Sequence, residues 1–209
     1  MPSPSLLPRR VAVSLLCGAA LLPVHAAPGD PDAAAFARRA VASGDNRQQP
    51  FAVIDKKNAR LFVYGTEGEL KASSPVLLGL ASGDASVPGI GARPMAQIKP
   101  DERTTPAGRF VSEPGRNTSG EDIVWVDYNA AISMHRVRAT NASERRLERL
   151  ASPSTADNRI SYGCINVPAA FYDAHVKPAL GTRYGVVYVL PESSPMSSHF
   201  AFLGDDEAR

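Results

Sequence analysis

The chain has 209 residues, with 23 basic and 21 acidic side chains, four histidines and two cysteines. This near balance of charge excludes the strongly basic surface of a nucleic-acid or membrane-surface binder, so we expect no nucleic-acid partner. The length suits one domain that can bury a sizeable core.

Residues 1–26 have the features of a secretory signal peptide. Arg9-Arg10 is followed by an apolar run at 11–22 that is too short to span a bilayer, and Val24-His25-Ala26 supplies a small-residue cleavage signal. Cys17 lies inside the apolar run and matches a lipidation site poorly, and two arginines alone are weak evidence for twin-arginine export. We therefore expect ordinary secretion to the periplasm or cell envelope.

Cleavage after Ala26 would leave 21 basic and 21 acidic residues, because the leader carries two arginines and no acids. The mature chain would be close to neutral and would contain no transmembrane segment. It would keep Cys164 as its single thiol, in an oxidising compartment. A thiol with no disulfide partner in its own chain is a small buried apolar residue, a site of unwanted oxidation or a reactive nucleophile.

The first part of the mature chain changes from polar to strand-forming. Residues 27–50 are predicted to form an N-terminal segment with one short helix at 33–42, followed by a linker. Runs rich in β-branched and aromatic residues predict strands at 51–55 and 60–64, joined by a turn, and a third strand is predicted at 70–80.

A long connection rich in glycine and proline follows at 81–105, and irregular connections of this length often line a functional site. Strands are then predicted at 109–111, 123–128 and 130–135. A helix is predicted at 141–150, with Ser143 as a possible cap.

The last part of the chain contains a second predicted helix at 168–177, stopped by Pro178, and a closing buried strand at 183–190. Residues 191–209 are interpreted as a polar tail. Together these patterns predict one mainly β domain at 51–190 with short helices.

Cys164 lies in the segment Ser161-Tyr162-Gly163-Cys164-Ile165-Asn166. A free thiol has a pKa near ~8.5, so it needs help to react as a thiolate at neutral pH. Asn166 is a good N-cap residue and Pro168 suits a first helical turn, which predicts a helix directly after the cysteine. The positive end of that helix would stabilise a thiolate.

His135 ends an apolar strand and is the candidate base for Cys164, with the ring later protonating a leaving amine. The N–H groups of Gly163 and Cys164 could form an oxyanion hole. The alternatives are a cysteine that is only a small buried apolar residue and a histidine that is only structural. His175 and His199 are expected to have no role in the site, and the spacing of these residues does not suit a metal.

Three segments in order resemble the L,D-transpeptidase catalytic domain, the YkuD family. Residues Thr105–Phe110 resemble its T-P-x-G-x-F segment, Met134-His135 its strand-end histidine, and Ser161–Asn166 its S-H-G-C-[IV]-R motif. The resemblance covers residues 51–190. It implies a β-sandwich of mixed sheets with short helices, one of them following the cysteine, and no metal or organic cofactor.

The resemblance also implies a role for each site residue, on peptidoglycan stem peptides of the cell wall. Cys164 would attack the L-centre carbonyl of a diamino acid and expel the terminal D-alanine, with His135 as general base and acid. The backbone carbonyl of Ser161 would orient the imidazole, and Gly163 would donate to the oxyanion. An amine of a second stem would then resolve the thioester. Hydrolysis of the same acyl-enzyme, as in a carboxypeptidase or amidase, and a catalytically silent wall-binding scaffold are the alternatives.

Two positions depart from the pattern of the family. Tyr162 stands where the family usually has histidine, and Asn166 where it usually has arginine. Asparagine cannot supply the charge with which arginine binds a carboxylate, so Asn166 predicts either an altered substrate or a different internal network. Tyr162 and Asn166 are both expected to be substrate-binding residues. Residues 136–159 form a long insertion between base and nucleophile, interpreted as a solvated surface helix or, alternatively, as a lid or acceptor-side wall.

Overall fold

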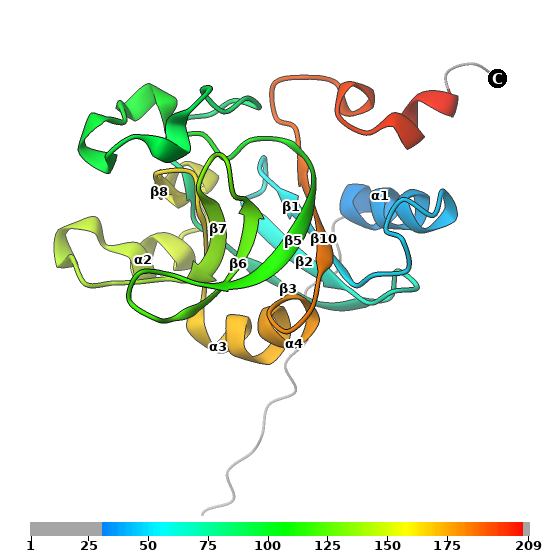
Figure 1. Cartoon of the computed structure of the whole chain (residues 1–209), viewed down its shortest axis with the longest axis horizontal. Helices are drawn as coiled ribbons and strands as arrows, with labels where there is room; N and C mark the ends of the chain where they lie inside the picture. Colours follow the sequence, from blue (N-terminus) through cyan, green and yellow to red (C-terminus); the bar gives the residue numbers. More distant parts are fainter. Residues whose placement is uncertain (1–30, 207–209) are drawn as a thin grey trace, which may run out of the picture.

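A computed structural model describes residues 31–206, so the predicted signal peptide lies outside the described residues. The chain forms one eight-stranded mixed sheet with the strand order β3-β2-β1-β10-β5-β6-β7-β9, and a small parallel sheet of β4 and β8 (Figure 1). The strands, in chain order, are β1 (Phe51–Asp55), β2 (Arg60–Tyr64), β3 (Leu70–Pro75), β4 (Leu78–Gly79), β5 (Gly108–Arg116), β6 (Asp122–Asp127), β7 (Ile132–Arg136), β8 (Arg159–Ser161), β9 (Ile165–Val167) and β10 (Gly185–Leu190).

The helical segments are short, apart from the first. They are α1 (Pro31–Ala42), η1 (Ile90–Ala92), η2 (Met95–Gln97), η3 (Pro100–Glu102), η4 (Ala142–Glu144), α2 (Arg146–Ala151), η5 (Thr155–Asn158), α3 (Ala169–Phe171), η6 (Tyr172–Val176), α4 (Lys177–Leu180), η7 (Met196–Ser198) and η8 (Ala201–Asp206). The mainly β architecture with short helices that the sequence predicts is confirmed. Within residues 31–206, no helix has the length and apolar character that crossing a membrane requires.

The long strand β5 joins the two halves of the large sheet. Its first part pairs with β10 and its second part with β6, so the sheet turns over and its halves face each other. Apolar side chains from β1 and β2 meet those from β6, β7 and β9 in one core, which α3, η6 and α4 close at one end. Burial of this shared core is the main stabilising contribution to the sandwich.

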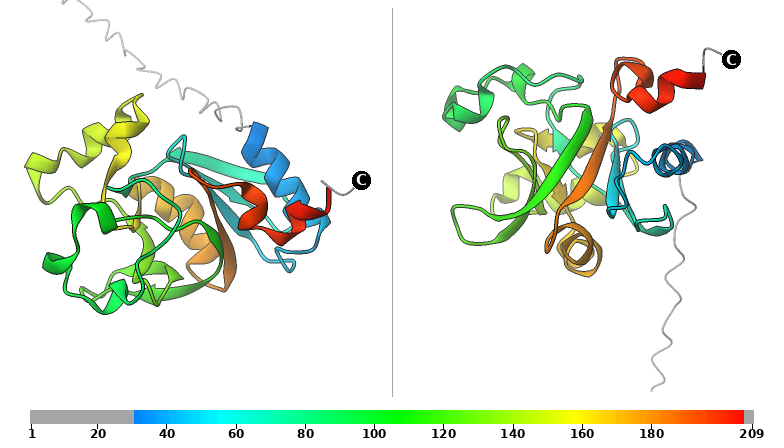
Figure 2. Two further views of the ribbon diagram at one scale, coloured as in Figure 1. Left: turned by 90° about the horizontal axis from the view of Figure 1, so that it is seen from above. Right: turned by 45° about the vertical axis from the view of Figure 1, so that its right-hand side comes forward.

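A second core lies on the outer face of β1, β2 and β10. There α1 packs beside η8, and Figures 1 and 2 show these segments from opposite ends of the chain side by side. Phe200 is 2% exposed and contacts the rings of Phe36 and Tyr188. The prediction of a polar tail is therefore wrong for this part of the chain, because Met196, Phe202 and Leu203 also pack against this core although polar residues dominate the segment.

Several predicted elements have other bounds in the structure. The strand predicted at 109–111 is the longer β5, and the helix predicted at 141–150 is divided into η4 and α2. The third strand stops at Pro75 and continues as β4 in the other sheet, because the chain turns towards β8. The last helix runs past Pro178 to Leu180. Pro178 lies in the first turn of α4, after a π-helical turn, where its missing N–H costs little.

Candidate active site

Cys164 lies in the tight turn that joins β8 to β9. Gly163 in this turn has a φ of 122°, and a Cβ on it would lie 2.6 Å from Ile132 Cδ1 and 2.8 Å from the Thr104 carbonyl, so the turn requires glycine. Ser161 Oγ accepts a hydrogen bond from Gly163 N–H at 3.0 Å and donates one to the Cys164 carbonyl at 2.6 Å. The local sequence therefore fixes the backbone on both sides of the thiol.

Thr105 anchors the same turn from a distant part of the chain. Its buried hydroxyl donates to the Gly163 carbonyl at 2.8 Å and accepts from Gly79 N–H at 2.9 Å. A Cβ on Gly79 would lie 2.3 Å from the Arg103 carbonyl, so this strand can approach only with glycine. The end of the long connection, predicted to line a site, supports the cysteine turn in this way.

No helix begins directly after Cys164, and the predicted cap at Asn166 is wrong. Asn166 is instead the middle residue of β9, opposite His135 of β7 in a parallel pairing. Helix α3 begins at Ala169, with Pro168 as its N-cap residue. Sheet pairing overrides the local capping preference, so neighbouring groups of the sheet and not a helix terminus stabilise a thiolate here.

His135 reaches the turn from the end of β7. Its Nδ1 atom lies 2.8 Å from the carbonyl oxygen of Arg136, which can only accept, so Nδ1 carries the ring proton and Nε2 is the basic nitrogen. The Ser161 carbonyl, predicted to orient the ring, accepts from Leu80 N–H at 2.9 Å instead. The residue that directly follows the histidine therefore has the orienting role.

Cys164 and His135 interact, and each shifts the pKa of the other towards the ion pair. Burial raises the pKa of the Cys164 thiol, but hydrogen bonding and charge interaction with His135 outweigh burial and hold this pKa below its ordinary value. Burial lowers the pKa of the His135 ring, but the interaction with Cys164 and the Arg136 carbonyl outweigh it and raise this pKa. The arrangement favours a thiolate beside an imidazolium.

Ser133 is a site residue that the sequence analysis missed. Its N–H lies 3.5 Å and its Oγ 3.6 Å from Cys164 Sγ, and both contacts lower the pKa of the thiol. Ser133 and His135 are two apart on β7, so they share one face of the strand. The sequence could have predicted this contact. Side chains two positions apart on a strand share a face, so a polar residue two positions before His135 lies beside Cys164 as well.

Asn166 is 1% exposed, and neighbouring groups take up both ends of its amide. Oδ1 accepts a hydrogen bond from Arg146 Nη1, while Nδ2 lies 3.3 Å from the Cys164 carbonyl and 3.4 Å from His135 Nε2. Asn166 belongs to the residues that line the candidate pocket, but its amide is bonded at both ends, so its main contacts form an internal network and its direct contact with substrate stays a prediction.

Tyr162 forms another side of the site. The guanidinium carbon of Arg103 lies 3.9 Å from the centre of its ring, a cation–π contact, and Arg103 also donates to the Ile98 carbonyl at 3.2 Å. Each variant position of the cysteine motif thus meets an arginine from elsewhere in the chain: Tyr162 meets Arg103, and Asn166 meets Arg146.

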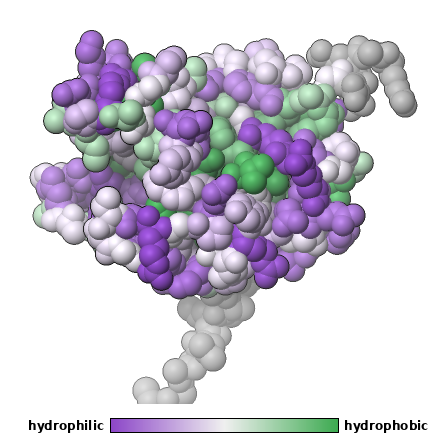
Figure 3. Space-filling view, viewed as in Figure 1, coloured by the Kyte–Doolittle hydropathy of each residue, from purple (hydrophilic) through white to green (hydrophobic). Residues whose placement is uncertain are grey.

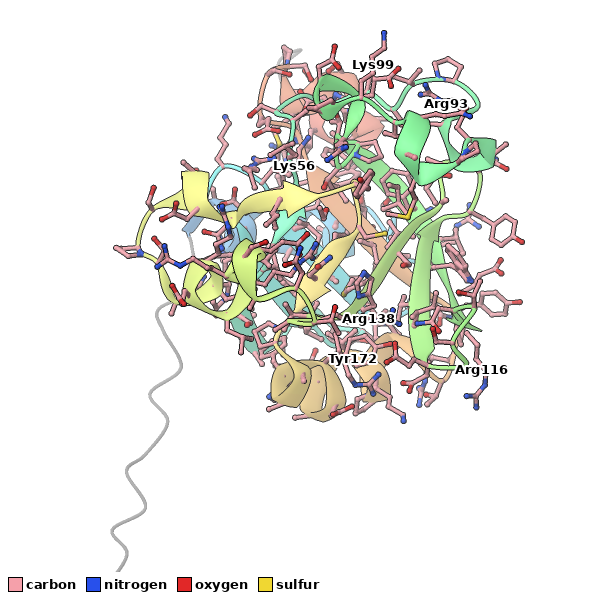
Figure 4. All side chains as sticks on the ribbon, turned by 90° about the vertical axis from the view of Figure 1, so that its left-hand side faces the viewer. Lys56, Arg93, Lys99, Arg116, Arg138 and Tyr172 are labelled. Carbon is pink, nitrogen blue, oxygen red and sulfur yellow. The ribbon has the colours of Figure 1, made fainter. Side chains whose placement is uncertain are left out.

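A pocket of about 330 Å³ lies at this site. Cys164, Tyr162 and His135 line it together with residues of the 136–159 insertion. Five of its residues come from the 136–159 segment, namely Arg138, Thr140, Asn141, Glu144 and Arg146. Figure 3 shows a mixed surface, purple with green spots, over the segment of η1–η3, and Figure 4, seen from the side of α2, labels Arg138. The insertion therefore forms one wall of the pocket.

The other two histidines within residues 31–206 lie outside this pocket. His175 contacts the ring of Phe171, and His199 Nε2 lies 2.7 Å from Ser194 Oγ. Over the same residues, no three His, Cys, Asp or Glu side chains gather as metal ligands would.

Comparison with known proteins gives matches among solved structures alone. No family model matches the chain. No curated protein matches it either. An L,D-transpeptidase from Mycobacterium smegmatis is 16% identical over 68% of this chain and 58% of its own length, with a TM-score of 0.39.

Two other solved structures show similar values. The helical cell shape determining protein Pgp2 from Campylobacter jejuni is 13% identical over 77% of this chain and 56% of its own, with a TM-score of 0.45. The catalytic domain of an L,D-transpeptidase from E. faecium is 17% identical over 68% of this chain and 98% of its own, with a TM-score of 0.37. Similarities this distant leave the chemistry of the site to be argued from its own side chains.

Proposed function

We propose that this protein is an exported cysteine acyltransferase of the cell envelope, which acts on peptidoglycan stem peptides through a thioester on Cys164. The observation that carries the proposal is the placement of Cys164 and His135 on one open pocket, with the ring held through Nδ1 and the sulfur beside Ser133 N–H. The directions of the two pKa shifts, towards the ion pair, agree with it. The order of three sequence segments that resemble L,D-transpeptidases supports the substrate class, and the leader at 1–26 supports export.

In the acylation step, the Cys164 thiolate attacks the L-centre carbonyl of the diamino acid and forms a tetrahedral oxyanion. The imidazolium of His135 gives its Nε2 proton to the departing amine of D-alanine as the carbon–nitrogen bond breaks. The products are a Cys164 thioester, free D-alanine and a neutral imidazole.

In the second step, an amine of another stem attacks the thioester, and Nε2 of His135 takes the proton that this amine loses. Collapse of the intermediate breaks the carbon–sulfur bond and restores the Cys164 thiolate beside the imidazolium. Ser133 assists in both steps, because its N–H and hydroxyl donate to the sulfur whenever it carries negative charge.

The oxyanion donors are the N–H groups of Cys164 and Gly163. In the resting geometry Gly163 N–H donates to Ser161 Oγ, so that bond must be exchanged for one to the substrate oxygen as the oxyanion forms. Ser161 Oγ also holds the Cys164 carbonyl, which keeps the turn in place during this exchange.

The test combines purified protein with a stem tetrapeptide, with and without a second amine, and follows intact-protein and product masses. We expect an adduct equal to the peptide minus D-alanine, and a cross-linked dimer when the amine is present. Cys164→Ala is the control and should give neither. Loss of D-alanine without a dimer would indicate the hydrolase, and the absence of adduct and turnover would indicate a scaffold.

A further inference from the structure

We propose that Arg146 is a positioning residue for His135, which it controls by holding the Asn166 amide in the orientation that donates to Nε2 of the ring. This inference goes beyond the proposed function. It concerns the protonation of one ring, whatever acyl group the protein transfers.

The orientation of the amide follows from the chemistry of arginine. A guanidinium has only donors, so the amide atom facing Arg146 Nη1 must be the acceptor Oδ1. Asn166 Nδ2 then points the other way, towards the Cys164 carbonyl at 3.3 Å and His135 Nε2 at 3.4 Å. If the amide were flipped, Nδ2 would face the N–H donors of Arg146 and Oδ1 would face the Cys164 carbonyl. The hydrogen bonds to Arg146 and to that carbonyl would both be lost.

Arg146 is itself held in place. Its side chain is 15% exposed, and its Nε donates to Glu144 Oε2 at 2.5 Å. Glu144 ends η4 and Arg146 begins α2, so the ion pair lies within the insertion between base and nucleophile. The insertion therefore contacts the catalytic ring through a defined path, which a solvated surface helix would not.

Two hydrogen bonds then select one form of the ring. The Arg136 carbonyl needs a proton on Nδ1, and Asn166 Nδ2 needs a lone pair on Nε2. Both are satisfied only by the neutral ring with Nε2 free to accept a proton, so the Asn166 amide acts against the imidazolium form that the interaction with Cys164 favours. Once Nε2 is protonated it faces another donor, so the amide favours loss of that proton, as a later transfer to a leaving amine requires.

Charged groups on several elements also act on the ring. Positive charge on the ring is favoured by a Cys164 thiolate and by acidic groups and is opposed by basic ones. These charged neighbours are Glu121, Arg138, Glu144, Arg146 and Cys164. Replacing Arg146 can therefore change the pKa of His135 in two ways, through the Asn166 amide and through removal of a nearby positive charge. The experiment must separate these two effects.

The experiment is an NMR pH titration of ¹⁵N-histidine in the Cys164→Ala protein, where the ring titrates without the thiol. We expect the neutral ring to carry its proton on Nδ1. In Arg146→Met the amide can turn Oδ1 towards Nε2, so the pKa of His135 should rise by about 0.5 to 1 unit. Arg146→Lys, which still donates to Oδ1, should show a smaller rise, and Arg145→Met, which removes an exposed charge next in sequence, almost none.

The decisive arm repeats Arg146→Met in an Asn166→Ala background, with folding checked by thermal unfolding. If Arg146 acts through the amide, its removal there should shift the pKa of His135 by less than half as much. An equal shift in both backgrounds, or a neutral ring protonated on Nε2, would overturn the proposal. Because no substrate is used and the thiol is absent, these outcomes are independent of the acyltransferase test.

Discussion

Two clusters of polar side chains in the interior have opposite characters. In the first, the Lys56 ammonium is buried and bonds to Asp84 at 2.7 Å and to the carbonyls of Gly83 and Thr105 at 2.5 and 3.0 Å. In the second, Cys164 and His135 face a pocket. Figure 4 labels Lys56 and, at the edge of the pocket, Arg138.

The difference shows what separates a structural cluster from a reactive one. Burial lowers the pKa of Lys56, while Asp84 and Glu192 oppose that shift, and the two carboxylate side chains are largely buried, at 8% and 11% exposed. At Cys164 the paired shifts favour charge on groups that a substrate can reach. Thr105 connects the two clusters. Its backbone carbonyl accepts a hydrogen bond from the Lys56 ammonium, and its hydroxyl donates one to the Gly163 carbonyl.

The largest effect is expected from removing the base. His135→Ala should slow acylation of Cys164 by about a thousand-fold, because general acid–base catalysis and thiolate stabilisation are lost together. Single-turnover mass spectrometry measures this rate, and the melting temperature should change by only a few degrees. A loss of less than ten-fold would mean that His135 is not the base.

The opposite pattern is expected for the structural cluster. Lys56→Met should lower the free energy of unfolding by about 3 kcal/mol, because Asp84 and Glu192 lose their buried partner. Denaturant unfolding measures this, and Lys71→Met, which breaks an exposed pair with Glu69, is the matched control. The folded variant should keep the alkylation rate of Cys164 within a few-fold, whereas a collapse of that rate would contradict the separation of the clusters.

Thr105→Val should affect both measurements. It leaves the Gly163 carbonyl and the Gly79 N–H unsatisfied at a buried position, which should cost about 2 kcal/mol of stability. Alkylation of Cys164 should also slow, because the turn is loosened. A change in stability alone would show that the hydroxyl does not position the thiol.

Ser133→Ala should give the smallest effect. The variant loses the Oγ contact with Sγ but keeps the N–H, so the pKa of Cys164 should rise by about half a unit. The pH profile of iodoacetamide alkylation should move upwards accordingly. Ser143→Ala, on the same side of the molecule but outside the pocket lining, should leave the profile in place.

The sequence was most informative where short motifs or strand periods decide the structure. The hairpin of β1 and β2 follows from two runs rich in β-branched and aromatic residues around a turn. The structure places Cys164 and His135 on one pocket. Ser133 could have been found by the period of two along β7. Arg146 could not, since its contact with Asn166 joins an insertion to a strand and leaves no local pattern.

The wrong predictions have the same physical origin. The cap at Asn166 and the polar tail after Leu190 were argued from local preference, but parallel pairing with β7 and burial of Phe200 against α1 decide those segments. The predicted orienting carbonyl of Ser161 instead accepts a hydrogen bond from the N–H of Leu80, directly after β4, whose approach depends on the tertiary fold.

The most direct test of the reactive pair is the pH dependence of Cys164 alkylation in the wild-type protein and in His135→Ala. We predict a half-maximal rate at a pH below ~8.5, the pKa of a free thiol, and an upward shift when the histidine is removed. A midpoint at or above that value in the wild type, or one unchanged in His135→Ala, would contradict the account.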